Sequence, residues 1–124
     1  MLGMARLSVW AATAKSRFRS RRHANKRAAQ LLRDVLTPEQ RAQYDRKGHF
    51  DVIGGQSGKR YRIRNGSQMN VEELGATGRR IRVLCFVPHG GLPMADTHLA
   101  QKLALELMED ETLKVARSGG WLGP

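Results

Sequence analysis

One stretch of strict alternation, residues 59–66, constrains the fold most. Charged and apolar side chains take turns there, in the order Arg60, Tyr61, Arg62, Ile63 and Arg64. Successive side chains of a strand point to opposite faces of its sheet, so the arginines share one face and the apolar residues share the other. Turns that contain glycine flank the stretch at residues 54–58 and 65–66. The pattern predicts a strand with one basic face and one core face.

A second basic strand is predicted in residues 79–87, where Arg80 and Arg82 alternate with apolar side chains. If the two strands are neighbours in a suitable register, one face of the sheet carries five arginines. Such a face is either a phosphate-binding surface or a solvated face with cross-strand ion pairs, and Glu72 and Glu73 can neutralise only some of its charge. The apolar second half of this strand, residues 83–87, is expected to be central in the sheet.

Basic residues are concentrated at the N-terminus. The chain of 124 residues has 22 basic and 11 acidic side chains, a net charge of +11. Nine of the basic residues precede Asp34, the first acidic residue, so the first 33 residues carry +9 and the rest of the chain carries only +2. This division favours an acidic partner such as nucleic acid. The length indicates one domain, the single cysteine excludes an intrachain disulfide, and no apolar run is long enough to span a membrane.

The N-terminal part of the chain is expected to contain an arm and a helix. Residues 1–18 are apolar, small and basic without acidic side chains, which is typical of an arm that is ordered by a partner or of an organelle transit peptide. Residues 19–36 predict an amphipathic helix whose basic side is either solvated or phosphate-binding. Its apolar stripe consists of Ala24, Ala28, Leu31 and Val35, and its basic side consists of Arg19, Arg22, Lys26 and Arg33.

The rest of the chain predicts an α+β fold. Thr37 and Gln40 form a capping box at the start of a second helix, which should end at Gly48. Strands are expected at residues 49–53, 59–64, 68–74 and 79–87, and a helix at residues 97–111 with Leu99, Leu103 and Leu107 on its core stripe. The expected architecture is two N-terminal helices, a small antiparallel sheet of three or four strands and a long C-terminal amphipathic helix.

This pattern divides the chain into three parts. They are an arm (residues 1–18), a single domain (residues 19–117) and a tail (residues 118–124). Trp121 in the tail is either a loose end or an apolar plug for a groove.

No catalytic or metal site is predicted, and no cofactor is expected. One cysteine and four widely spaced histidines do not give a zinc-binding pattern. Cys85 lies in an apolar strand, where burial disfavours the thiolate that catalysis needs. The glycine-rich run at residues 54–59 lacks the spacing of a P-loop and precedes a strand, so it predicts a hairpin turn. Its backbone N–H groups and Lys59 could still approach a phosphate.

Short motifs give a first resemblance. The chain resembles a family of small uncharacterised bacterial and bacteriophage proteins over most of residues 20–117. The shared motifs are Leu-Thr-Pro-Glu-Gln at residues 36–40, Tyr-Arg-Ile-Arg at residues 61–64, Asn-Val at residues 70–71 and Leu-Ala-Gln-Lys-Leu at residues 99–103. This resemblance implies no particular activity.

The strands are also similar to those of RelE-type toxins, which are ribosome-dependent ribonucleases with two helices before an antiparallel sheet. The similar segments are Tyr-Arg-Ile-Arg-Asn-Gly at residues 61–66 and Arg-Ile-Arg-Val-Leu at residues 80–84. The chain departs from that family after Gly66, where Ser-Gln-Met-Asn stands in place of Asp-Tyr-Arg, and in its long C-terminal helix. A ribonuclease of this kind would stabilise its transition state with Arg62, Arg64, Arg82 and His89.

We therefore expect a small, basic, non-enzymatic protein that binds nucleic acid, either DNA or RNA, through phosphate contacts. The residues assigned to the interface are Arg17, Arg19, Arg22, Lys26, Arg33, Lys59, Arg60, Arg62, Arg64, Arg80 and Arg82. One alternative is a structural subunit of a virion or a ribosome-like particle, which docks on other protein subunits through its arm. The other is the ribonuclease. The expected location is the cytoplasm or a virion, without a membrane partner.

Overall fold

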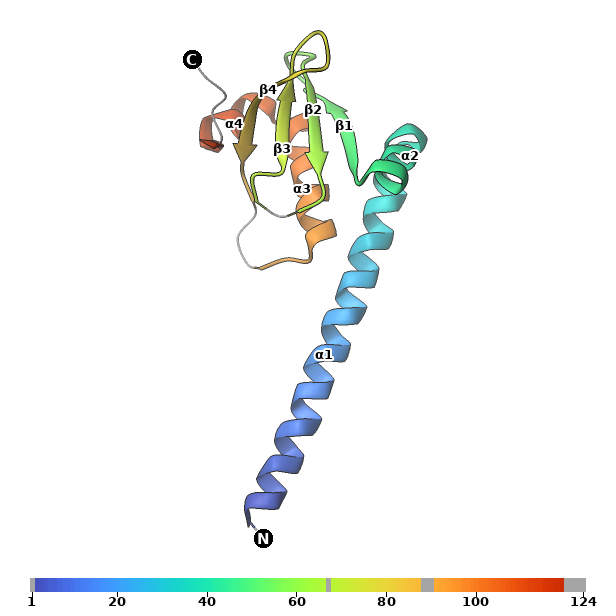
Figure 1. The fold of residues 1–124 in the computed structure, drawn as a ribbon, viewed down its shortest axis with the longest axis vertical. Helices are drawn as coiled ribbons and strands as arrows, with labels where there is room; N and C mark the ends of the chain where they lie inside the picture. The colour runs from blue at the N-terminus through green and yellow to red at the C-terminus, as the bar shows by residue number, and fades with distance from the viewer. Residues whose placement is uncertain (1, 67, 88–90, 120–124) are drawn as a thin grey trace.

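The computed structural model describes residues 2–66, 68–87 and 91–119. In chain order the elements are α1 (Leu2–Val35), α2 (Pro38–Lys47), β1 (His49–Ile53), β2 (Arg60–Arg64), β3 (Val71–Leu74), β4 (Arg80–Cys85), α3 (Met94–Leu107), α4 (Glu109–Val115) and β5 (Arg117–Gly119). The fold is α+β, as predicted. Figure 1 shows α1 as a long rod that projects away from a small domain, in which α3 lies against the sheet.

The helices differ from the prediction at both ends of the chain. α1 begins at Leu2 instead of residue 19, so the predicted boundary between arm and helix falls inside one continuous helix. Residues 2–18 are rich in alanine, which has the highest helix propensity, and contain no proline. The predicted long C-terminal helix is instead two helices, α3 and α4. Met108 separates them because its backbone leaves the helical conformation (φ −140°, ψ 46°).

The sheet is an antiparallel meander in the order β1-β2-β3-β4-β5. The first four strands lie where the sequence predicts them, although β3 and β4 are shorter, and β5 adds a fifth strand beside β4. Residues paired across neighbouring strands share a face. Phe50, Ile63 and Val71 therefore lie on the core face, whereas Asp51 and Arg62 lie on the outer face.

α2 forms as its sequence predicts and also protects one edge of the sheet. Thr37 and Gln40 make both hydrogen bonds of the capping box, and Gly48 ends the helix in the left-handed conformation (φ 71°) that glycine adopts without strain. The side chain of Gln40 donates to the backbone oxygen of Asp51 (2.9 Å), and the side chain of Gln43 accepts from the Asp51 N–H (2.9 Å). The edge strand β1 therefore has fewer free backbone groups to offer to another strand.

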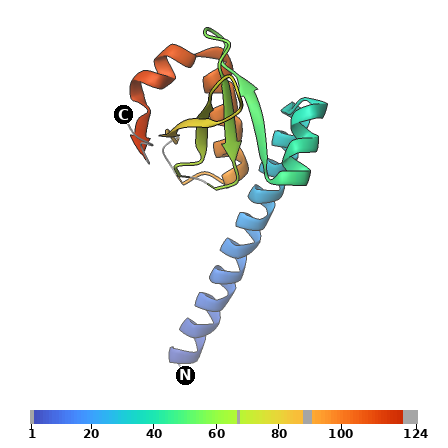
Figure 2. The same cartoon turned by 45° about the horizontal axis from the view of Figure 1, so that its top comes forward.

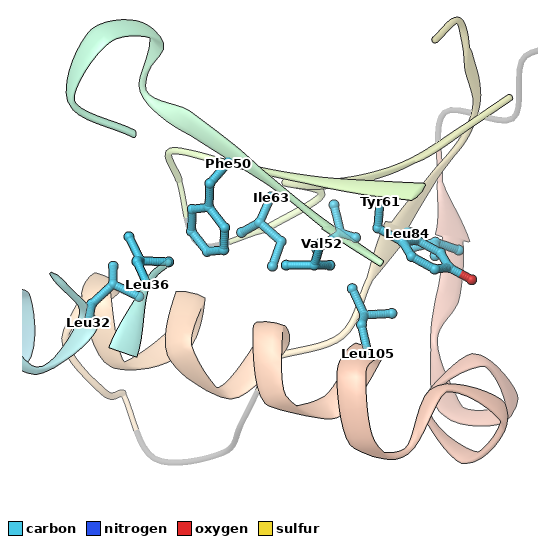
Figure 3. Packing of buried hydrophobic residues seen from close by; sticks show 9 residues of the cluster. Leu32, Leu36, Phe50, Val52, Tyr61, Ile63, Leu84 and Leu105 are labelled. Carbon is cyan, nitrogen blue, oxygen red and sulfur yellow. The ribbon is translucent and has the colours of Figure 1, made fainter. Parts of the chain in front are cut away.

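The core lies between one face of the sheet, α3 and the C-terminal end of α1 (Figure 3). The predicted apolar stripe of α1 is correct at Ala28, which is buried, but wrong at Leu31 and Val35, which are 49% and 39% exposed. Leu32 and Leu36 are buried instead. Spacing of four residues aligns these two leucines with Ala28 on one face, and α1 packs against α3 there. The core cluster consists of Leu32, Leu36, Phe50, Val52, Tyr61, Ile63, Val71, Leu84 and Leu105.

α3 faces the core with a different side from the one predicted. Leu103 and Leu107 are 39% and 73% exposed, and Leu99 is only partly buried. The most buried side chains of α3 include Leu105 and two polar residues, His98 and Gln101. The prediction failed because apolar spacing alone does not reveal buried polar side chains whose hydrogen-bond partners lie on distant elements.

Hydrogen bonds across the core account for this orientation of α3. Gln101 and Asn70 exchange two side-chain hydrogen bonds of 2.8 and 3.0 Å. The Nε2 atom of His98 donates to the carbonyl oxygen of Gly66 (2.6 Å), and its Nδ1 atom accepts from the Tyr44 hydroxyl (3.1 Å). Burial lowers the pKa of His98, which favours the neutral ring that this arrangement requires. These contacts tie α3 to the loops at one end of the sheet and to α2.

Candidate nucleic-acid interface

The residues predicted to contact nucleic acid fall into two groups. The α1 group consists of Arg17, Arg19, Arg22, Lys26 and Arg33, and the sheet group consists of Lys59, Arg60, Arg62, Arg64, Arg80 and Arg82. Figures 1 and 2 show most of α1 well away from the sheet. The structure therefore does not bring the two groups together on one surface.

The part of α1 that carries most of the first group is open to solvent. Among residues 14–27, all side chains are exposed except Ala24, which is half-buried. Four basic residues recur at intervals of four, three and four positions, which places them along one side of the helix. They are Lys15, Arg19, Arg22 and Lys26. The prediction included Arg17 from the expected arm but left out Lys15, which the continuous helix α1 places in line with Arg19.

The side chains of Arg19, Arg22, His23 and Lys26 line a shallow hollow of about 230 Å³. The guanidinium carbon of Arg22 lies 5.8 Å from the centroid of the Phe18 ring, a cation–π contact one turn apart. Within the part of the chain that the structure describes, no carboxylate forms an ion pair with a basic residue between positions 15 and 27. Their positive charge is therefore available to a polyanion.

Arg33, in contrast, links α1 to α2. Its guanidinium forms an ion pair with Asp45, and this contact raises the pKa of Arg33 and lowers the pKa of Asp45. The side chain of Arg41 donates to the backbone oxygen of Arg33 at 2.8 and 3.0 Å. Such bonds satisfy a carbonyl group at the end of a helix, where no partner within the helix is present. The contacts of Arg33 with Asp45 and Arg41 thus stabilise the corner between α1 and α2.

The prediction that five arginines share one face of the sheet is wrong for Arg82. The register between β3 and β4 shifts between Glu73 and Leu74, so that Arg80 lies opposite Leu74 and Arg82 lies opposite Glu73. Glu73 and Leu74 are consecutive residues of β3, so their side chains point to opposite faces of the sheet. Arg82 and Arg80, which lie opposite them on β4, therefore also point to opposite faces. Arg82 lies on the core face, where it donates to Glu73 at 3.0 Å.

On the outer face, carboxylates neutralise most of the arginines. Arg62 binds Asp51 with contacts of 2.8 and 3.2 Å, and the pKa of Arg62 is raised by that hydrogen bond. Arg64 and Arg80 bind the two oxygens of the same carboxylate, Glu72, whose side chain is only 4% exposed. Of the two interpretations drawn from the sequence, these contacts match the face with cross-strand ion pairs.

His49 adds no positive charge to the outer face of the sheet. His49 is paired with Arg64 across the first two strands, and its Nδ1 atom is buried without a hydrogen-bond partner among the described residues. Burial lowers the pKa of His49, and the nearby guanidinium of Arg62 lowers it further. His49 is therefore neutral at pH 7.

Lys59 and Arg60 are the members of the sheet group that form no ion pair within the described part of the chain. Both are exposed, and they line a hollow of about 340 Å³ together with the turn at Ser57 and Gly58. The turn thus offers two cations at one end of the sheet, far fewer than α1 offers.

The glycine-rich turn does bind an anion, but that anion belongs to the protein. The carboxylate of Glu109 accepts hydrogen bonds from the N–H groups of Gln56 (3.0 Å) and Ser57 (2.7 Å), from the Ser57 hydroxyl and from the Tyr61 hydroxyl (2.6 Å). Burial would raise the pKa of Glu109, but these hydrogen bonds outweigh it and lower the pKa to about 2. The backbone donors that were considered for phosphate are therefore already used.

The glycines of this turn allow the close approach. A Cβ atom on Gly54 would lie 2.2 Å from a carboxylate oxygen of Glu109, and one on Gly55 would lie 1.9 Å from the backbone oxygen of Glu106. No local signal identifies the partner of the turn in the sequence, because Glu109 follows Ser57 by 52 positions. This contact explains why a glycine-rich run precedes a strand here.

The structure describes one free cysteine and, among the described residues, no metal-binding cluster of His, Cys, Asp and Glu. The cysteine, Cys85, is half-buried. His89, which the ribonuclease interpretation would use, lies outside the described residues, as does Trp121. In the ranges that the structure covers, no helix is both long enough and apolar enough to cross a membrane.

Comparisons of the chain with protein-family models, with curated proteins and with solved structures find no match. The two resemblances drawn from the sequence motifs therefore stay predictions.

Proposed function

We propose that this protein binds nucleic acid without catalysing a reaction, and that α1 supplies the phosphate contacts. The observation that carries the proposal is the difference in pairing between the two basic groups. The basic residues at positions 15–27 of α1 are exposed and unpaired in the described structure, while most sheet arginines bind carboxylates. A phosphate group that reaches α1 therefore meets guanidinium and ammonium groups that no carboxylate already neutralises.

The electrostatics of α1 support the same conclusion. Lys15 and Arg19, like Arg22 and Lys26, are four positions apart, and like charges at that spacing destabilise a helix. A row of phosphates would relieve this repulsion. Lys59 and Arg60 at the end of the sheet could add a weaker second contact, because they are also exposed and unpaired within the described chain.

A salt titration with two matched variants tests the proposal. The first variant changes Lys15, Arg19, Arg22 and Lys26 to Gln. The second is the control and changes four exposed basic residues elsewhere, Arg46, Lys47, Arg79 and Lys114, to Gln. Each lost phosphate contact reduces the slope of log affinity against log salt by about 0.9 for duplex DNA, so the first variant should lose about 3 to 4 from its slope.

The control variant has the same net charge and should retain most of the slope. Equal losses in both variants would mean that binding depends only on net charge, and the assignment to α1 would be wrong. If the unmodified chain binds neither duplex nor single strand at about 0.15 M salt, the nucleic-acid proposal fails.

A structural subunit of an assembly is the second candidate, because α1 also exposes an apolar side chain. Phe18 is 63% exposed, in the part of α1 (residues 14–23) where all described side chains are exposed. A subunit would use α1 to dock on neighbouring chains. Failure of nucleic-acid binding in the titration, together with concentration-dependent association in sedimentation, would favour this candidate.

A further inference from the structure

We infer that α1 enters the major groove of double-stranded DNA, an inference that depends on the nucleic-acid function proposed above. The segment that would enter the groove is the exposed part of α1 at residues 15–27. Three stripes of side chains run side by side along this segment, each with helical spacing, and together they match the chemistry of a groove with two walls and a floor.

The first stripe is the cationic row described above. It consists of Lys15, Arg19, Arg22 and Lys26. The second stripe is displaced by one residue, which corresponds to about 100° around the helix axis. It consists of Ser16, Ser20, His23 and Arg27, all exposed. The two serines are small enough to let the backbone approach a surface closely, and all four side chains can form hydrogen bonds.

The third stripe is displaced by a further residue in the same direction. Arg17 and Arg21 lie on it, followed by Ala24 and Ala28, where the helix begins to pack on the domain. Cations therefore flank the serine stripe on both sides, each about 100° away. A helix that only lies on a phosphate surface needs cations on one side. Cations on both sides suit a helix placed between two rows of phosphates.

The dimensions of a free helix match this placement. The major groove of B-form DNA is about 12 Å wide, and an α-helix with its side chains is about 10–12 Å across. Residues 15–27 span about 18 Å along the axis. In A-form RNA the major groove is too narrow and deep for side chains to read, so duplex RNA should bind less well.

The rest of the molecule leaves room for the DNA. Among the described side chains of α1, the first fully buried one is Ala28, and both ribbon views show the preceding turns clear of the sheet (Figures 1 and 2). No acidic residue precedes Asp34, so nothing on this segment repels the phosphate walls. Residues 15–27 can therefore lie in a DNA groove along their whole length, up to the point where α1 meets the domain.

The test uses duplex probes that differ in one groove. The unmodified protein is titrated with plain duplex DNA, with duplex DNA whose major groove is filled by glucosylated hydroxymethylcytosine, with DNA whose minor groove is occupied by netropsin, with duplex RNA and with single-stranded DNA. The inference predicts that filling the major groove weakens binding by about tenfold or more, whereas netropsin has little effect.

Two protein variants complete the test. Ser16→Leu with Ser20→Leu adds bulk to the proposed floor stripe and should weaken binding to plain duplex DNA by about tenfold but spare single-stranded DNA. The control is Asn25→Leu, because Asn25 is exposed on the opposite side of the helix and should tolerate the same bulk. Circular dichroism checks that each variant retains its helical content.

The outcomes separate the two proposals. Equal affinity for all duplex and single-stranded probes, with no effect of the serine variants, would overturn the major-groove inference but leave phosphate binding by α1 intact. No binding to any probe would overturn both. Loss of binding with netropsin instead of glucosylation would place the protein in the minor groove and also contradict the inference.

Discussion

α1 and the outer face of the sheet are the two arginine-rich regions of this molecule, and they differ in the location of the carboxylates. On the sheet, Asp51 and Glu72 lie across neighbouring strands from the arginines that they bind. On α1, no acidic residue precedes Asp34. The comparison teaches that the number of arginines alone says little about a surface, because arginines that pair with carboxylates stabilise the sheet while unpaired ones keep their positive charge.

The two regions should also respond in opposite ways when two arginines are removed. The double change Arg64→Gln with Arg80→Gln leaves Glu72 buried without its partners, so it should reduce the free energy of unfolding by about 3 kcal/mol. Urea denaturation measures this change. Binding of duplex DNA by the folded variant should change less than about threefold, since the account assigns these arginines to stability.

The matched change on α1 is Arg19→Gln with Arg22→Gln. It should alter the free energy of unfolding by less than about 1 kcal/mol, because both side chains are exposed, form no ion pair within the described chain, and lose only the cation–π contact of Arg22 with Phe18. It should nevertheless weaken DNA binding clearly more than the sheet variant does. If both variants lose affinity equally, the two regions share the interface and the contrast between them is wrong.

The next largest effect concerns the contact between the glycine-rich turn and Glu109. Glu109→Gln removes the charge that four donors bind, so we expect a loss of about 2 kcal/mol in the free energy of unfolding. Glu111→Gln is the control because Glu111 is exposed in the same helix. A loss below about 0.5 kcal/mol for Glu109→Gln would show that the turn does not depend on this carboxylate.

The pH dependence of that contact has a definite sign. Hydrogen bonds lower the pKa of Glu109 from its ordinary value of 4.5 to about 2 in the folded protein. A carboxyl group with a depressed folded pKa stabilises the protein fully above its unfolded pKa and loses this contribution as the pH falls through its folded pKa. The stability difference between the unmodified protein and Glu109→Gln should thus be constant above pH 5 and shrink between about pH 4.5 and pH 2. A difference that does not change in that range would contradict the assigned pKa.

The smallest expected effect sharpens the description of α1 itself. Repulsion between like charges four positions apart, as in Lys15 and Arg19, costs a helix about 0.2–0.5 kcal/mol per pair. Salt screens such exposed charges, so the helical signal in circular dichroism should rise slightly between low and high salt. The variant with Gln at the four positions of the cationic row should show a clearly smaller rise, because only Arg17 and Arg21 remain as like charges four positions apart in this segment. A rise of the same size in that variant would mean that the repulsion does not limit the helix.

Local patterns in the sequence were sufficient to predict the elements that depend on neighbouring residues. The alternation from Arg60 to Arg64 defined β2 and its core face, and the capping box of Thr37 and Gln40 defined α2. These signals are local because a strand has period two and a helix cap spans one turn. The overall α+β class followed from the order of these elements.

Features that depend on distant partners could not be predicted in this way. The core side of α3 is set by Gln101, whose partner Asn70 lies 31 positions earlier. The separation of Arg80 and Arg82 onto opposite faces depends on a register shift between β3 and β4, which no local pattern marks. For the candidate site, the basic row on α1 was largely apparent from the sequence. The ion pairs of the sheet arginines could not be predicted in this way, because they depend on the register of four strands.

Hydrogen–deuterium exchange of the free and DNA-bound protein tests the central claim most directly. In the free protein the amides of residues 15–27 should exchange rapidly, because all side chains of this segment are exposed except the half-buried Ala24. Addition of duplex DNA should protect these amides strongly and leave β1 to β4 unchanged. Protection of the strands without protection of α1 would contradict the account and assign the interface to the sheet.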